Sequence, residues 1–223
     1  MRRSLFLIVI GCGGAAILIG LGIWQIQRLA WKEGVIADID ARIAAAPVDL
    51  PAQPDPEADS YLPVAVTGTM GEAYLRVLVS QKDIGAGYRI ISPLQTDTGT
   101  LMVDRGFVVT NAPVPPAPEG AVTVTGNLQW PQEVDGFTPD PDRDGNIWFA
   151  REVGVMAEAL GTDPVLVVAR TTSFNDAPVS PLPVDTSAIP NDHLQYAITW
   201  FSLAAIWLGM SVAFLLRARR ARP

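Results

Sequence analysis

Two long apolar stretches, one near each end of the chain, dominate the pattern of hydrophobic and polar positions. Residues 4–23 and 196–216 contain no charged side chain. At about 1.5 Å per residue, a helix of this length covers the hydrocarbon core of a bilayer, roughly 30 Å thick. We therefore predict transmembrane helices at 4–23 and 196–216. No small-residue cleavage site follows the first stretch, so we interpret it as an uncleaved anchor.

The region that follows the first span has the pattern of an amphipathic helix over residues 24–46. Charged residues separate its apolar positions, which recur at helical spacing. These positions are Leu29, Ile36, Ile39 and Ile43. Pro47 ends the helix, and a proline-rich, acidic linker extends to Pro56.

From residue 61 the hydrophobic period changes from helical to alternating. Short β-branched or aromatic runs are separated by glycines, a pattern typical of strands joined by turns. The expected strands are 61–67, 73–79, 88–94, 101–109, 122–128 and 164–170. A short helix over 152–160, closed by Gly161, precedes the last of them. We expect an α+β membrane protein in which two transmembrane helices flank a mainly antiparallel β domain over 61–170, either a small barrel or a sandwich.

The distribution of charge predicts the orientation of both spans. All 23 acidic residues lie between the spans with 10 basic ones, a net charge of −13. The six basic residues outside the spans are Arg2, Arg3, Arg217, Arg219, Arg220 and Arg222. Because Lys and Arg accumulate on the cytoplasmic side of membranes, we expect both termini in the cytoplasm and residues 24–195 in the periplasm. The absence of an arginine-rich transit peptide favours a bacterial inner membrane.

Composition argues against several classes of site. The only cysteine, Cys12, lies in the first span, so the outer domain has neither a disulfide framework nor a CxxCH site for covalent haem. The chain contains no GxSxG or HExxH motif, which disfavours a membrane-anchored hydrolase. It has no glycine-rich phosphate loop and no basic patch, and the acidic outer domain argues against nucleic acid as a partner.

The second span is entered through the sequence Pro-Asn-Asp-His-Leu-Gln-Tyr, which contains His193, the only histidine. Asn191 and Asp192 are candidates for the helix N-cap. Aromatic residues follow at the level expected for lipid headgroups. By itself, His193 has an ordinary interpretation as a capping or interfacial residue, and an alternative one as a metal ligand.

Seven blocks of sequence, in order and at similar spacing, resemble the Surfeit locus protein 1 family. Residues 21–28 leave the first span and residues 191–201 enter the second. Shorter blocks lie between them at 61–64, 85–88, 93–94, 103–106 and 146–148. Phe107 stands where this family has tryptophan. The resemblance covers nearly the whole chain from Gly20 onward.

The resemblance implies an assembly factor for cytochrome c oxidase, and not an enzyme. Such a protein binds haem a transiently and assists its insertion into oxidase subunit I, with His193 as an axial ligand of the haem iron. Haem a synthase and other oxidase assembly factors are further candidate partners, beside membrane lipid. The alternative is a haem-free scaffold that holds subunit I while other proteins insert the cofactor.

Four residues near His193 complete the candidate cofactor site. Trp24, Tyr196 and Trp200 are expected interfacial aromatics that alternatively stack on the haem. Arg28 either anchors its helix among the headgroups or pairs with a haem propionate.

Two other features carry structural predictions. Asp104 and Arg105 are expected to make a structural salt bridge or turn, and not to act in acid–base catalysis. Small residues recur every four positions in both spans and are predicted to face each other across a helix pair. They are Cys12, Ala16 and Gly20 in the first span, and Ala205, Gly209 and Ala213 in the second.

Overall fold

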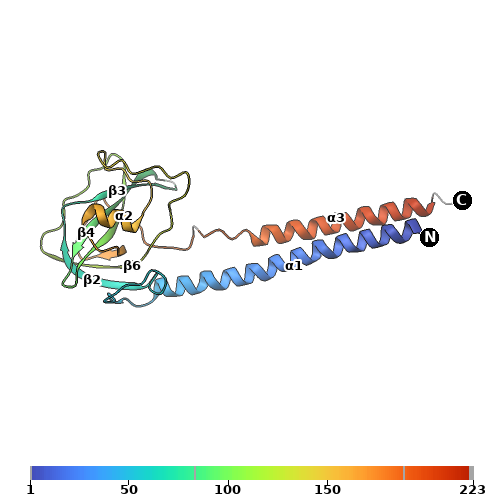
Figure 1. Ribbon diagram of the computed structural model, residues 1–223, viewed down its shortest axis with the longest axis horizontal. Coiled ribbons are helices and arrows are strands. Elements are labelled where there is room, and N and C mark those ends of the chain that lie inside the picture. The colour runs from blue at the N-terminus through green and yellow to red at the C-terminus, as the bar shows by residue number, and fades with distance from the viewer. Residues whose placement is uncertain (1, 83, 188, 221–223) are drawn as a thin grey trace. The chain divides into compact units, whose positions relative to one another are not determined.

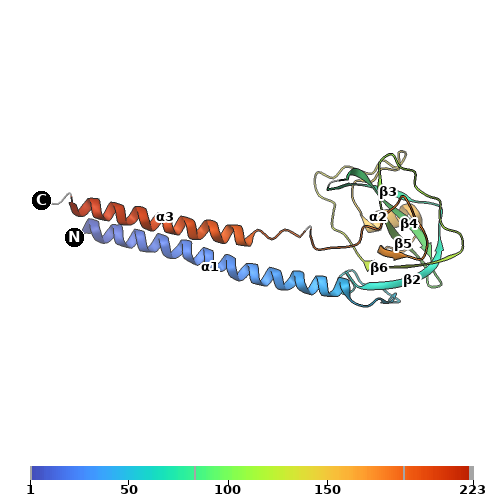
Figure 2. The same cartoon turned by 180° about the vertical axis from the view of Figure 1, so that it is seen from behind.

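The computed structural model describes residues 2–82, 84–187 and 189–220, and it divides into two compact units (Figure 1 and Figure 2). The helical unit comprises Met1–Asp38 and Thr186–Pro223, and the β unit comprises Ile39–Asp185. Arg222, one of the terminal arginines used for the predicted orientation, lies outside the described residues.

The helical unit is a pair of antiparallel helices, α1 (Arg2–Ala44) and α3 (His193–Arg220). Both views show the two helices side by side (Figure 1 and Figure 2). The predicted span at 4–23 and the predicted amphipathic helix at 24–46 form one continuous helix, in which no proline interrupts the backbone hydrogen bonds. Both helices are long and apolar enough to cross a membrane.

The two helices approach closely where glycine replaces a side chain. A Cβ atom at Gly14 would lie 2.5 Å from Nε1 of Trp207, and one at Gly22 would lie 2.7 Å from the Phe201 ring. The Trp207 indole also donates a hydrogen bond of 3.1 Å to the carbonyl oxygen of Gly11. Large aromatic rings of α3 thus occupy the space that the glycines of α1 leave free.

The predicted small-residue stripes are wrong. Cys12, Ala16, Ala205 and Ala213 are exposed, and a Cβ at Gly20 or Gly209 would meet no atom within 4 Å. The buried seam contains Gly11, Ala15, Gly22 and Gln25 on α1, and Ala197 and Ala204 on α3. A strict four-residue spacing turns about 40° around the helix at each step, whereas a mixture of three and four keeps one stripe facing the partner.

The described residues of the β unit form seven strands and one short helix. They are β1 (Val48–Asp49), β2 (Pro63–Met70), β3 (Leu75–Gln81), β4 (Gly85–Gln95), β5 (Thr100–Val109), β6 (Ala121–Leu128), α2 (Val153–Leu160) and β7 (Leu166–Thr172). Six of the strands and α2 confirm the predicted elements within a few residues. Gly161 is the left-handed C-cap of α2, with φ of 66°. Strand β1 was not predicted, and it lies in the expected linker.

The strands form one mixed sheet in the order β1-β2-β6-β7-β5-β4-β3. Strand β7 pairs parallel to β5 and antiparallel to β6, and β1 pairs parallel to β2. The expectation of a barrel or sandwich is therefore corrected. Strands β2 and β4 meet at only two residue pairs, Thr69 with Gln95 and Met70 with Leu94, so the sheet curls without closing along its length.

Aliphatic side chains form a core cluster on each face of the sheet, because successive residues of a strand point to opposite faces. One cluster contains Val64, Leu94 and Leu128, and the other packs Met156 of α2 against Ile91 and other residues of the sheet. Burying such side chains provides the main favourable term for folding.

The β unit also holds the C-terminal end of α1. The side-chain amide of Asn127 donates to the carbonyl of Ile43 at 3.1 Å and to that of Tyr61 at 2.9 Å. Arg170 donates to the same Ile43 carbonyl at 3.2 Å. Carbonyl groups in the last turn of a helix have no partner within it, so these donors stabilise the end of α1.

Candidate functional site

The candidate site in the helical unit is centred on His193, the first residue of α3. Its Nδ1 atom lies 2.8 Å from Oε1 of Gln25 on α1, and the two side chains are hydrogen-bonded. His193 is half-buried, and Gln25 is buried with 8% of its surface exposed. The helical seam therefore brings together two polar side chains that are 168 positions apart in the sequence.

This hydrogen bond determines which nitrogen of the imidazole is free. An amide oxygen only accepts hydrogen bonds, so this contact suits the tautomer of His193 that carries its proton on Nδ1 and donates it to Gln25. The lone pair of the neutral ring is then on Nε2. Histidines that bind metals in proteins are commonly held in this way, with one nitrogen on a protein acceptor and the other on the metal. The donor set therefore fits an iron ligand.

The other predicted site residues lie within two turns of this pair along their helices. Trp24 and Tyr196 are exposed, whereas Trp200 is half-buried. The guanidinium of Arg28 lies over the ring of Trp31, 3.8 Å from its centroid, a cation–π contact within α1. These positions leave two aromatic faces open to the surroundings of the helices.

Two polar atoms near this site are buried without a partner. Nε1 of Trp200 and Oδ1 of Asn191 make no hydrogen bond with any described residue. A buried donor or acceptor that lacks a partner costs about 1–3 kcal/mol. A shallow hollow of about 370 Å³ lies on the first turns of α3 and is lined by Asn191, Asp192, Leu194, Gln195, Ile198 and Thr199.

Gln25 was missed in the reasoning from sequence alone, although it lies within the block at 21–28. The available signal was its polarity beside a run of apolar residues. Its spacing of three from Gly22 and of fourteen from Gly11 matches the seam. However, the seam itself is known only once the register of α1 against α3 is known.

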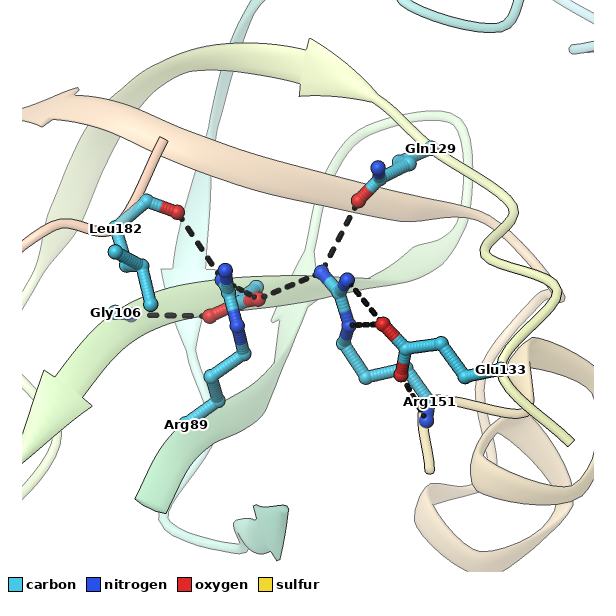
Figure 3. A network of polar contacts seen from close by, with 7 residues as sticks. Arg89, Gly106, Gln129, Glu133, Arg151 and Leu182 are labelled. Carbon is cyan, nitrogen blue, oxygen red and sulfur yellow. Dashed lines mark hydrogen bonds and ion pairs between the residues drawn. The ribbon is translucent and has the colours of Figure 1, made fainter. Parts of the chain in front are cut away.

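The β unit contains a second polar cluster, centred on the fully buried side chain of Asp104 (Figure 3). Its carboxylate accepts hydrogen bonds from Arg89 at 2.6 Å, from Arg151 at 3.5 Å and from the backbone N–H of Gly106 at 3.1 Å. Arg89 also donates to the carbonyl of Leu182 at 3.1 Å. Two guanidinium groups and one carboxylate are thus held in one buried contact.

Arg151 connects this cluster to Gln129 and to the partly exposed Glu133 (Figure 3). It donates to Gln129 at 3.0 Å and through Nε to Glu133 at 3.0 Å, and its backbone N–H donates to the same carboxylate at 2.8 Å. Partial burial raises the pKa of Glu133, but the hydrogen bonds and charge of Arg151 outweigh this, and the pKa lies below its ordinary value. Burial lowers the pKa of Arg151, but Glu133 and Asp104 raise it further, and the net shift is upward. The cluster is therefore charged and balanced, with two carboxylates facing two guanidinium groups.

Arg105 makes a separate buried ion pair with Asp176, through Nε and Nη2 of its guanidinium group. It is the extra residue of a β-bulge, because Ile90 pairs with Gly106 while Ile91 pairs with Asp104. A structural salt bridge or turn was predicted for Asp104 and Arg105. Both residues do form buried salt bridges, but with separate partners and not with each other. Gly106 follows with φ of 124°, and a Cβ atom there would collide with the carbonyl of Ser180. Residues 104–106 therefore connect β5 with other strands and loops of the β unit.

Comparison with known proteins gives the family. The model of the SURF1 family matches residues 13–205. The chain is 32% identical to Surfeit locus protein 1 of Homo sapiens over 211 residues, which cover 83% of this chain and 70% of the human protein. The protein of the same name from Rattus norvegicus is also 32% identical over 211 residues, covering 83% of this chain and 68% of its own.

A SURF1-like protein of Monosiga brevicollis is 34% identical over 215 residues, covering 86% of this chain and 81% of its own. The matched region includes both residues of the helical site and the buried clusters of the β unit. The resemblance inferred from the seven sequence blocks is confirmed, and the chain belongs to the SURF1 family.

Proposed function

We propose that this protein is a membrane-anchored assembly factor for cytochrome c oxidase that binds haem a before its insertion into subunit I. Membership of the SURF1 family supports the class of function. The observation that carries the haem assignment is the hydrogen bond from Nδ1 of His193 to Gln25, which leaves Nε2 as a free ligand atom.

Anchoring in a membrane is supported by the surface of the helical pair. Large apolar side chains remain exposed around both helices, among them Phe6, Ile17, Ile206 and Phe214. Helices with apolar side chains on all sides are stable when lipid or protein covers them. We place both helices across a bacterial inner membrane, with both termini in the cytoplasm and residues 24–195 in the periplasm.

The orientation is tested with a reporter enzyme that is active only outside the cytoplasm. A fusion at Asn111, in the loop after β5, is expected to be active, and a fusion after Pro223 is expected to be inactive. The opposite result would reverse the proposed orientation while leaving the helices themselves unaffected.

Haem a is the cargo in this proposal, and its iron supplies the bond to a nitrogen ligand. His193 holds the iron, and Trp24, Tyr196 and Trp200 offer aromatic faces to the macrocycle. Arg28 pairs with a propionate after leaving the ring of Trp31. Since His193 is the only histidine, no second histidine of the same chain completes the coordination. This suits a carrier that passes haem a from its source, such as haem a synthase, to subunit I.

The test is to express the protein together with the haem a synthesis pathway and to purify it in detergent. The wild type is expected to carry haem with a distinct Soret band, and His193→Ala to lose it at unchanged protein level. Ser202→Ala, an exposed change farther along α3, serves as the control and should keep the haem. Equal haem content in wild type and His193→Ala would refute the assignment of His193.

One feature favours the alternative of a haem-free scaffold. Phe137 is 95% exposed, on a loop shaped by hydrogen bonds between Asp135 and its neighbours Phe137 and Thr138. An aromatic side chain held in water is suited to contact with another protein. In the scaffold reading, neither wild type nor His193→Ala contains haem, while Phe137→Ala reduces the amount of subunit I that copurifies.

A further inference from the structure

We infer that Gln25 is a positioning residue that holds His193 in the Nδ1–H tautomer and so directs the lone pair of Nε2 towards a ligand. The inference deepens the proposed function and rests on it for the identity of the metal. The tautomer itself is a property of the haem-free protein and can be measured separately.

The position of Gln25 makes it suited to this role. It is buried in the seam, one turn after Gly22, where the Phe201 ring of α3 packs against the backbone of α1. Burial in this closely packed seam limits the rotamers that its side chain can adopt. The amide oxygen is therefore held at a fixed place opposite the start of α3.

Burial also disfavours replacement of the Gln25–His193 hydrogen bond by hydrogen bonds to water. Gln25 is 8% exposed, and its amide oxygen loses its solvation when the helices pair. Breaking the contact would leave a buried acceptor without a donor, which is more costly than the net gain of an average hydrogen bond. The pair therefore favours one tautomer of His193 as long as α1 and α3 are packed together.

A neutral amide suits this role better than a charged group would. A carboxylate opposite Nδ1 would stabilise the positively charged imidazolium, in which both nitrogens carry protons and neither can bind a metal. The amide of Gln25 orients the ring without adding charge to the apolar seam. Nε2 then remains available as a ligand.

The tautomer is measured by ¹⁵N NMR on the full-length, haem-free protein in detergent, with only histidine labelled. His193 is the only histidine, so one imidazole contributes signals when the affinity tag contains none. The spectra are recorded at pH 9. We expect Nδ1 of the wild type to show a protonated-nitrogen shift and Nε2 an unprotonated one.

Three variants separate positioning from general structure. Gln25→Leu removes the acceptor and is expected to move the tautomer ratio roughly five- to tenfold towards Nε2–H, the effect of one buried hydrogen bond. Gln25→Glu restores an acceptor and should return the spectrum to the wild-type form at this pH. Gln27→Leu, the same type of change at an exposed site on α1, should leave the spectrum unchanged.

The effect of Gln25 on metal binding is tested by titrating the same detergent-solubilised proteins with ferric protoporphyrin IX. Loss of an outer partner of a metal-bound histidine typically weakens metal affinity about 10- to 100-fold, so Gln25→Leu should bind at least tenfold more weakly than Gln27→Leu. Equal affinities would overturn the positioning role.

A wild-type ring protonated on Nε2, or identical spectra for wild type and Gln25→Leu, would overturn the tautomer assignment. Failure of the proposed function gives a different result. In that case the wild type shows the expected tautomer but binds no porphyrin.

Discussion

The two units of this protein bury polar groups in different ways. Among the described residues of the β unit, the buried charged groups are matched, Asp104 with Arg89 and Arg151, and Arg105 with Asp176. The buried polar side chain described in the helical unit is that of Gln25, a neutral amide. The bond between His193 and Gln25 there still leaves Nε2 of His193 free for a ligand. The helical unit thus offers an atom that can bind a ligand, whereas the buried charges of the β unit stabilise its fold.

The two units also differ in the size of the side chains that pack in their interiors. Large aliphatic side chains such as Ile90, Leu94 and Met102 fill the β unit. In the helical seam, glycines of α1 leave room for aromatic rings of α3. A core of large side chains is stabilised by removal of apolar surface from water, whereas close helix contacts depend on shape. Mutations of the two units should therefore act by different mechanisms.

The largest effect is expected from breaking the buried charges of the β unit. Asp104→Ala would leave Arg89 and Arg151 buried without their shared carboxylate, and removal of one partner from a buried ion pair costs about 3–5 kcal/mol. We expect a large fall in the unfolding temperature of the detergent-solubilised protein, followed by near-UV circular dichroism. Asp140→Ala, at an exposed carboxylate in the segment between β6 and α2, is the control. Equal unfolding temperatures for the two variants would show that the network does not stabilise the β unit.

A smaller effect is expected from filling the helical seam. Gly14→Leu would displace the Trp207 ring and break its hydrogen bond to Gly11, and overpacking of this kind costs about 1–3 kcal/mol. Gly13→Leu is the matched control, because a side chain at Gly13 meets no atom within 4 Å.

Helix pairing in these variants is measured by disulfide formation between cysteines placed at Gly11 and Ser211, with Cys12 replaced by alanine. A Cβ at Gly11 lies 2.9 Å from that of Ser211, close enough for a disulfide after a small shift. Counting the remaining free thiols gives the yield. If Gly13→Leu lowers the yield as much as Gly14→Leu, the assigned seam is wrong.

A third, smaller effect on stability is expected at two tryptophans of α3, one of which has no hydrogen-bond partner among the described residues. Trp200→Phe removes a buried N–H that has no acceptor among the described residues, so we expect a change within about 1 kcal/mol of zero in the free energy of unfolding. Trp207→Phe removes an indole that donates to Gly11, and should destabilise by about 1 kcal/mol more. Chemical denaturation in detergent compares the two variants. A greater loss for Trp200→Phe would show that its indole has a partner in the folded protein.

The smallest expected effect is the pH-dependent contribution of Glu133, the partly exposed carboxylate of the charged network, to stability. The pKa of Glu133 is lowered in the folded protein, so its ionised form stabilises the fold above its ordinary pKa of 4.5. Since the side chain is 37% exposed, solvent weakens this contribution. Glu133→Gln should lower the unfolding temperature slightly at neutral pH. The difference from wild type should vanish as the pH falls through the lowered pKa, and a difference that grows in acid would contradict this account.

Local sequence patterns determined the elements of this fold. The uncharged runs near each end predicted α1 and α3, and alternating apolar positions between glycines predicted six of the seven strands. These patterns are readable because helical and extended backbones repeat every 3.6 and 2 residues, whatever surrounds them. His193 was also found from sequence, because it is the only histidine and lies within a block that resembles the family.

The arrangement of these elements was decided by contacts between residues far apart in the chain. Strand β7 lies between β5 and β6, Asp104 and Arg105 pair with different partners, and the helical seam uses Gly11 and Gly14 instead of Cys12 and Ala16. The hydrogen bond between Gln25 and His193 depends on the register of α1 against α3, which a single residue of slip would destroy. Periodicity gives the faces of a helix or strand, but only packing of the whole chain selects which face meets which partner.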